Sequence, residues 1–227
     1  MTHPAAPEAD ARERVLAAAG DLMARRGIRE VDLGQVATAA GVSVGQLREH
    51  FPTKQQLAEA FLQRREEEWT LGFVAAGARL RGGDSPEDRL LAIFEVFHDW
   101  FQRDDFEACS FINVLIEMGR EHPLGIASRE YLANIRALVQ GLAADAGLDR
   151  PEEFAASWHI LMKGSIISAV EGDTEAAMRA QLMARDLMAR YRRPTVEDEI
   201  ELSLESWTDR TPVAASTTGE RYVDDWG

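Results

Sequence analysis

Residues 43–50, SVGQLREH, combine an apolar and a polar face within one short segment. Leu47 and Phe51 are four residues apart, so they share one side of a helix. The residues left for the opposite side are Val44, Gln46, Arg48 and His50. Arginine and glutamine side chains can hydrogen-bond the edges of base pairs, and histidine or serine can bond phosphate oxygens. This face therefore has chemistry suited to DNA, with Arg48 and Gln46 as base readers and His50 or Ser43 as phosphate ligands.

Helix start and stop signals surround this segment. Two pairs of residues have the spacing of a capping box, Asp32 with Gln35 and Ser43 with Gln46. Gly41 stands where a residue in the left-handed conformation commonly ends a helix. Pro52 cannot continue the hydrogen-bond ladder of the second helix. Together these signals predict two short helices, over 32–40 and 43–51, joined by a tight turn.

An ordinary helical hairpin inside a helical core is the alternative interpretation. A recognition helix must lie close to its partner helix, and the small residues Ala37 and Gly41 allow such an approach. The polar outer face would then be free to enter the major groove. Because the turn, both caps and the polar face agree, the pattern favours DNA binding over the hairpin.

The surrounding sequence resembles the TetR family of transcriptional regulators. RERVLAAAGDLMARRGIREV (12–31) is similar to the family's first helix and following loop, and AAGVSVGQLREHFPTKQQL (39–57) to its A-G-V-S-x-G-x-L-Y-x-Y-F-x-x-K-x-x-L pattern. The resemblance implies an all-α fold, with an N-terminal three-helix helix-turn-helix domain followed by a larger helical ligand-binding and dimerisation domain. It also implies a sequence-specific transcriptional regulator of operator DNA, a repressor that a small-molecule effector releases.

The resemblance assigns DNA contacts to two neighbouring segments. The recognition helix supplies Ser43, Val44, Gln46, Arg48 and His50, and the start of the next helix supplies Thr53 and Lys54. The free N–H groups at such a helix start suit an anion such as phosphate. The chain departs from the family where a lysine is common at Val44, where aromatic residues are replaced by Arg48 and His50, and where Val31 and Gly34 replace polar residues. These departures leave an alternative, a small-molecule-binding helical protein whose helix-turn-helix has lost DNA binding.

Composition limits how such a protein could contact nucleic acid. The chain has 227 residues, enough for one or two domains with a substantial core. Its formal net charge is −14, whereas affinity for nucleic acid rises with the number of phosphates that basic residues neutralise. We therefore expect DNA contact only through a local face, with reliance on a homodimer.

Targeting signals are not evident. The single cysteine excludes an intramolecular disulfide and fits a reducing compartment. The N-terminal residues lack the apolar core of a signal peptide, and no apolar run reaches the roughly 20 residues that span a bilayer. We expect a cytoplasmic protein with no membrane partner.

The periodicity of apolar residues and the positions of helix start and stop signals divide the chain into four parts. Residues 1–9 are expected to be a disordered leader, 10–52 the helix-turn-helix domain, 53–191 the helical effector-binding and dimerisation domain, and 192–227 an acidic extension. A long helix is predicted from Thr53 to about Leu80, and later helices over 85–101, 108–118, 122–146, 151–170 and 174–191. The extension carries apolar residues at helical spacing, so a docked amphipathic segment and a solvated tail both stay open. A competitor that mimics DNA is a third possibility.

Most of the aromatic residues after position 53 are expected to form a helical core. The resemblance nevertheless implies a pocket for a small apolar or amphipathic effector, and a helical bundle can leave such a cavity with a few polar groups. The candidates for its lining are Trp69, Phe73, Phe97, Trp100, Phe101, Cys109, Asn113, Trp158, His159 and Met162.

The last two predicted helices resemble the family's dimerisation pair. They combine small residues, which allow close helix packing, with apolar ones. The expected interface residues are Ala156, Ile160, Gly164, Ile167, Ala177, Ala180, Met183 and Leu187. A two-fold axis through this pair would place two recognition helices on successive major grooves.

Enzymatic and metal sites find little support in the sequence. Cys109 could act as a nucleophile with His98 or His159, but a lone cysteine on an apolar helix is more often a small buried hydrophobe. Glu95 and His98 have the spacing of a di-iron ligand pair, yet the second copy that such a site requires is missing. We expect neither a metal nor a cofactor, and a non-enzymatic protein.

Overall fold

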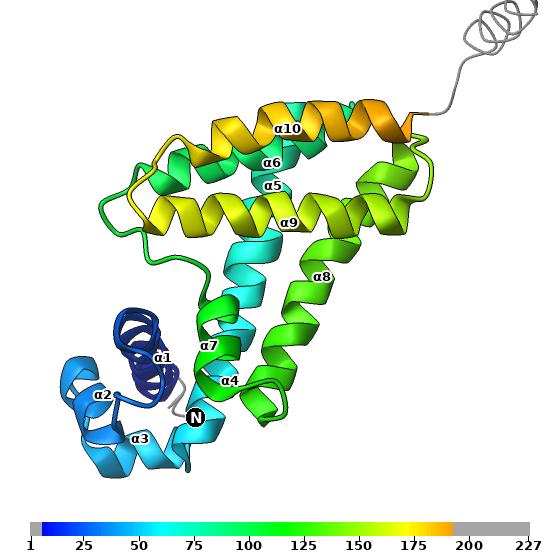
Figure 1. Ribbon diagram of the computed structural model, residues 1–227. Coiled ribbons are helices and arrows are strands. Elements are labelled where there is room, and N and C mark those ends of the chain that lie inside the picture. The colour runs from blue at the N-terminus through cyan, green and yellow to red at the C-terminus, as the bar shows by residue number, and fades with distance from the viewer. Residues whose placement is uncertain (1–5, 193–227) are drawn as a thin grey trace, which may run out of the picture. The chain divides into compact units, whose positions relative to one another are not determined.

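The computed structural model describes residues 6–192, and every regular element among them is a helix (Figure 1). The elements are α1 (Ala6–Arg26), α2 (Leu33–Ala40), α3 (Val44–His50), α4 (Lys54–Arg65), the π-helix η1 (Glu66–Ala75), α5 (Ala76–Gly82), α6 (Pro86–Phe101), α7 (Ser110–Met118), α8 (Pro123–Asp145), α9 (Pro151–Val170) and α10 (Ala176–Tyr191). The predicted all-α class is therefore confirmed. The acidic extension after residue 192 lies outside the described residues.

Helix α1 begins earlier than the sequence suggested. It starts at Ala6, so residues 6–9 belong to the helix rather than to the disordered leader expected over 1–9. Proline is well suited to a first helical turn because its missing N–H has no partner there, and alanine is the best helix former. The segment from Ala6 to Ala9 contains both residue types, which accounts for the earlier start.

The turn between α2 and α3 has the predicted geometry. Gly41 is in the left-handed conformation, with φ 65° and ψ 37°, and the next amide, that of Val42, donates to the Ala37 carbonyl over 3.0 Å. At the start of α2, the Asp32 carboxylate accepts from the Gln35 amide over 2.9 Å, and the Gln35 side chain accepts from the Asp32 amide over 3.0 Å. Both predicted capping boxes and the glycine turn are thus confirmed.

The first four helices pack around a shared apolar core. Leu47 of α3 and Val36 of α2 are fully buried, and Phe51 is 4% exposed. Arg12 of α1 lies over the Phe51 ring, 5.2 Å from its centroid, and covers the C-terminal end of α3. Because α3 has only seven residues, it depends on this packing rather than on its own helix propensity.

The long helix predicted from Thr53 is interrupted by a different helical geometry. The helical run extends from Lys54 to Gly82, but residues 66–75 form a π-helix, which has a wider turn than an α-helix. Buried Glu66 is held at its start by the Thr70 hydroxyl, which donates over 2.6 Å, and by the Asn134 side-chain amide of α8 over 3.1 Å. The periodicity of apolar residues does not reveal such a segment. One of the hydrogen bonds that hold the Glu66 carboxylate comes from Asn134, which lies far away in the sequence.

Helix α6 is the centre of the second half of the described chain. It packs against α5, α8, α9 and α10, and its side chains Ile93, Phe94 and Phe97 have no exposed surface. Phe94 lies 5.2 Å from Trp158 of α9, centroid to centroid. Helices α9 and α10 lie side by side across α6 (Figure 1).

One histidine is enclosed in this core. His159 of α9 is 3% exposed, and its Nδ1 atom has no hydrogen-bond partner among the described residues. Burial lowers the pKa of His159 to about 4, and the positive charges of Lys163 and Arg136 act in the same direction. The imidazole is therefore neutral at pH 7.

This histidine should make stability sensitive to mild acid. The unfolded chain takes up a proton at His159 near pH 6.5, whereas the folded chain resists protonation until about pH 4. The free energy of unfolding should therefore fall as the pH decreases from 6.5 to 4, by at most about 3 kcal/mol from this residue. Denaturant melts of the parent and of His159→Leu across this range measure the difference. Parallel pH profiles for the two proteins would contradict the assignment.

Candidate functional site

The seven residues predicted to face DNA all have solvent-accessible surface. Ser43, Gln46, Arg48 and Thr53 are exposed, Val44 is 39% exposed, and His50 and Lys54 are half-buried. The Arg48 guanidinium has no ion pair among the described residues, although Glu49 follows it directly in the chain. The Gln46 side-chain oxygen, in contrast, already accepts from the Ser43 amide over 3.0 Å. Arg48 is therefore the group on this face that is most available to an external acceptor.

The start of α4 lies next to the loop that follows α1. Thr53 and Gln56 form a capping box at this start. The Lys54 ammonium donates to the Arg29 carbonyl over 3.0 Å, which fixes the helix start against that loop. An ammonium has three N–H donors, so Lys54 can hold this contact and still bind a phosphate oxygen.

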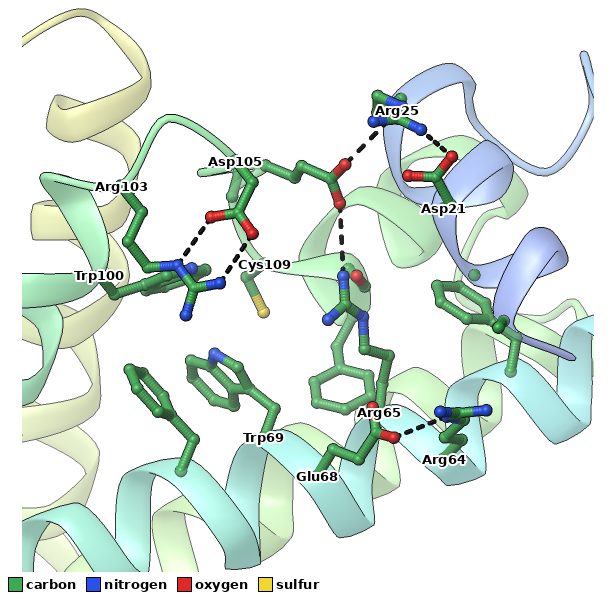
Figure 2. A pocket seen from close by; sticks show the side chains of 18 of the residues that line it. Asp21, Arg25, Arg64, Arg65, Glu68, Trp69, Trp100, Arg103, Asp105 and Cys109 are labelled. Atoms are coloured by element: carbon green, nitrogen blue, oxygen red, sulfur yellow. Dashed lines mark hydrogen bonds and ion pairs between the residues drawn. The ribbon is translucent and has the colours of Figure 1, made fainter. Parts of the chain in front are cut away.

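A cavity of about 440 Å³ lies between α1, the α4–η1 run and the loop over residues 102–109 (Figure 2). Four of the predicted pocket residues line it, namely Trp69, Phe73, Trp100 and Cys109. Asn113 instead lines a separate cavity, which Gly27 and Glu117 also border. The remaining candidates Phe97, Phe101, Trp158, His159 and Met162 are buried in the core and line neither cavity. They fill the space between helices, as the aromatic contacts of Phe97 and Trp158 illustrate.

Charged residues surround the mouth of this cavity, and no sequence pattern indicates that they meet there. The guanidinium groups belong to Arg25, Arg64, Arg65 and Arg103, and the carboxylates to Asp21, Glu68, Asp105 and Glu107. They come from three separate stretches of the chain. In a linear sequence each is indistinguishable from an ordinary solvated helix charge, so only the fold brings them together.

The cavity offers little support for catalysis. Burial raises the pKa of the Cys109 thiol, and the side chain is 4% exposed. A protonated, enclosed thiol is a poor nucleophile at neutral pH. Among residues 6–192 no group of three or more histidine, cysteine, aspartate or glutamate side chains could hold a metal ion.

The predicted dimer residues divide between an exposed and a buried set. Ile160 is 66% exposed, Ile167 46% and Met183 58%, and Ala156 and Gly164 also face solvent. Leu187 is half-buried. Ala177 and Ala180, in contrast, are buried at 0% and 6% exposure within the chain's own core, because α10 uses that face to pack on α6 and α9. They therefore cannot belong to an interface formed by the outer face of α9 and α10.

Glu117 of α7 joins the helix-turn-helix region to the rest of the chain. Its carboxylate accepts from the backbone N–H groups of Ile28, over 2.9 Å, and Arg29, over 2.6 Å. Gly27 precedes them with φ +84°, and a Cβ there would lie 3.0 Å from the carboxylate. A charged acceptor shared by two amides is stronger than a neutral one. No sequence pattern indicates this contact, because the partners are 89 and 88 residues apart.

Removal of this carboxylate should loosen the region after α1. Glu117→Ala is expected to lower the free energy of unfolding by about 1–3 kcal/mol, since two backbone amides lose a charged acceptor. It should also speed hydrogen exchange at the Ile28 and Arg29 amides. Glu121→Ala is the control, because Glu121 is exposed and pairs only with its neighbour Arg120 among the described residues. Equal exchange rates in both variants would show that Glu117 does not hold this segment.

None of the helices between residues 6 and 192 has the length and apolar composition needed to cross a membrane.

Comparisons with known proteins agree with the architecture. Residues 15–61 match the model of the bacterial regulatory proteins of the tetR family. A curated relative, the HTH-type transcriptional activator FasR of Mycolicibacterium smegmatis, is 33% identical over 98 residues, which are 43% of this chain and 43% of the relative. The match thus spans well under half the length of that relative.

Solved structures extend the likeness over most of the chain. A TetR-family transcriptional regulator from Streptomyces coelicolor matches with a TM-score of 0.74 at 20% identity, over 82% of this chain and 97% of the other. A TetR transcriptional regulator from Chloroflexus aurantiacus matches with a TM-score of 0.67 at 24% identity, over 78% and 93%. The multidrug binding protein EbrR, solved with malachite green, matches with a TM-score of 0.61 at 22% identity, over 78% and 97%. At these identities the likenesses concern the fold.

Proposed function

We propose that this chain is a transcriptional regulator of the TetR type, which binds double-stranded operator DNA as a homodimer and is released by a small-molecule effector; the match of residues 15–61 to the tetR family supports this. The observation that carries the proposal is the outer face of α3. It presents the guanidinium of Arg48, which has no ion pair among residues 6–192, on a helix that capping and packing hold in place. We further propose that the protein acts in the cytoplasm as a repressor.

The contacts to DNA follow from the positions of the side chains. With α3 in the major groove, Arg48 would donate to base edges, and guanine is the base that arginine binds best. Ser43, His50, Lys54 and the N–H groups at the start of α4 would bind phosphates and fix the orientation. Val44 stands where the family commonly has a lysine. Its side chain can contact a thymine methyl group and would then take part in base recognition.

The homodimer would form through the exposed face of α9 and α10. Five large apolar side chains project from these helices, Ile160, Ile167, Val170, Leu182 and Met183. A contiguous exposed apolar patch on a folded domain is typical of an interaction surface. A two-fold axis through it would place two copies of α3 about 34 Å apart, which matches successive major grooves.

Repression and activation share the same DNA contacts. The curated relative FasR is named an activator, whereas we propose repression for this chain because effector-released binding most simply blocks a promoter. Reporter output from a promoter–reporter strain with and without the regulator distinguishes repression from activation. Lower reporter output in the absence of the regulator would overturn repression and leave DNA binding intact.

Substitution of Arg48 should weaken specific DNA binding. Arg48→Ala is expected to cost about 1–3 kcal/mol in affinity for DNA from the chain's own promoter, because a bidentate base contact is lost. Fluorescence anisotropy at several salt concentrations measures this loss. Arg120→Ala, which removes an 80% exposed arginine between α7 and α8, is the matched control. No salt-sensitive specific binding, either to promoter DNA or to a selected pool, would reject operator binding and favour a ligand-binding protein without DNA function.

A charge placed on the α9–α10 face should break the dimer. Ile160→Glu together with Met183→Glu is expected to give a monomer in light scattering after gel filtration, because carboxylates would be buried without partners. Ile116→Glu on α7, where the side chain is 75% exposed, is the control and should leave the mass unchanged. A monomeric parent protein at micromolar concentration would remove the two-groove geometry.

A further inference from the structure

We propose that the cavity of about 440 Å³ beside α1 binds an amphipathic carboxylate, with its apolar body against Trp69 and Trp100 and its carboxylate on Arg65 and Arg25. The inference rests on the proposed function in one respect only, namely that this ligand is the effector. The volume of the cavity falls within the range of small-molecule sites.

The inner wall of the cavity is aromatic. Trp69 of η1 and Trp100 of α6 meet edge to face, with ring centroids 5.4 Å apart, and Phe111 of α7 lies 6.5 Å from Trp69. Figure 2 shows Trp69 and Trp100 on one side of the space, with Asp105 above them and Arg65, Glu68 and Arg64 to their right. This arrangement suits a ligand with a flat or extended apolar body and a polar end.

The guanidinium groups at the mouth are not equally satisfied. Arg103 forms two hydrogen bonds of 2.7 Å with Asp105, and Arg64 is paired with both Glu68 and Glu13. The only ion pair of Arg65 among the described residues is with Glu107, at 3.4 Å. Strong charge-assisted hydrogen bonds have lengths near 2.8 Å, so the contact with Glu107 leaves N–H donors of Arg65 available. The Arg65 side chain is only 33% exposed, so water reaches these donors only in part.

A donor of another residue that lines the cavity lacks an acceptor in the described part of the chain. The indole Nε1 of Trp69 is buried and has no hydrogen-bond partner among residues 6–192, and it lies one helical turn after Arg65. A buried N–H without an acceptor costs free energy that a bound acceptor would recover. Arg65 and Trp69 together therefore favour a ligand that supplies oxygen acceptors.

A cationic ligand fits less well. Each carboxylate that lines the cavity is already paired with a guanidinium, Asp21 with Arg25, Glu68 with Arg64, Asp105 with Arg103, and Glu107 with Arg65. A cation would therefore have to displace an arginine from its partner. An anion needs only to replace Glu107 on Arg65 and to share the donors of Arg25 with Asp21.

Glu107 gives such a ligand a route to the DNA-binding region. One carboxylate oxygen lies 3.4 Å from Arg65, and the other lies 4.0 Å from Arg25 in the last turn of α1. Both distances are long for hydrogen bonds, so this bridge is weak. A ligand carboxylate that takes its place would detach the 102–109 loop from α1 and connect α1 to the ligand instead.

The test uses naphthoate as the probe and the full chain. Calorimetric titration should detect naphthoate binding, at least about tenfold weaker binding of the neutral naphthamide, and still weaker binding of naphthylmethylammonium. Arg65→Gln should weaken naphthoate binding by at least about tenfold. The control is Arg81→Gln, because Arg81 has nearly the same exposure, 32%, pairs with Asp99 and does not line the cavity.

Two conservative variants protect the test against misfolding. Trp69→Phe keeps an aromatic ring while it removes the N–H donor and part of the apolar surface, and Arg65→Lys keeps the charge but loses the forked geometry. Both should weaken naphthoate binding with an unchanged circular dichroism spectrum. Binding of naphthoate that none of these variants affects, absence of binding, or a preference for the ammonium probe would each overturn the proposal.

DNA binding is measured on the same samples, so the two proposals can fail separately. Naphthoate binding through Arg65 in a chain that binds no DNA would keep the cavity ligand and reject the regulator function. Operator binding without naphthoate binding would keep the regulator function and reject the cavity ligand. If both occur, naphthoate should change operator affinity in the parent but not in Arg65→Gln, and an unchanged affinity in the parent would overturn the effector role.

Discussion

Burial of helix α4 from two sides is the constraint on which the rest of the structure depends. Leu57, Ala58, Phe61 and Leu62 are almost fully enclosed, and α4 packs against α1 in one direction and against α7 and α8 in the other. The helix-turn-helix and the larger helical part therefore share one apolar core rather than meeting across a linker. A change in the packing of α8 or η1 is transmitted to α1 because close-packed side chains shift together.

Polar contacts complete this connection where apolar packing ends. Glu117 binds the backbone that follows α1, Lys54 binds the same loop at the Arg29 carbonyl, and Glu107 bridges loosely to Arg25. The first two contacts are short and hold the loop in place. The third is long, at 4.0 Å, and lies at the mouth of the cavity, so it is the weakest of the three contacts.

Local signals in the sequence were sufficient for the helix-turn-helix. The capping pairs, Gly41 and Pro52 act on residues within a few positions of themselves, and the structure has the predicted caps and turn. The pocket was predicted less well, because long-range packing decides whether an aromatic residue such as Trp158 fills the core or, like Trp69, lines a cavity. The π-helix and the Glu117 contact also depend on partners distant in sequence, so no local pattern reports them.

The overall charge places both proposed sites under the same electrostatic restriction. A chain of net charge −14 repels anions at long range, so any anion site must be built locally. On α3 this is achieved by Arg48, an arginine without a carboxylate partner in the part of the chain that the structure describes. In the cavity it is achieved by a partly desolvated arginine, Arg65, whose partner Glu107 is too distant to satisfy it. Both guanidinium groups belong to the short segment from α3 to α4, and that segment therefore connects the proposed DNA contact with the proposed effector contact.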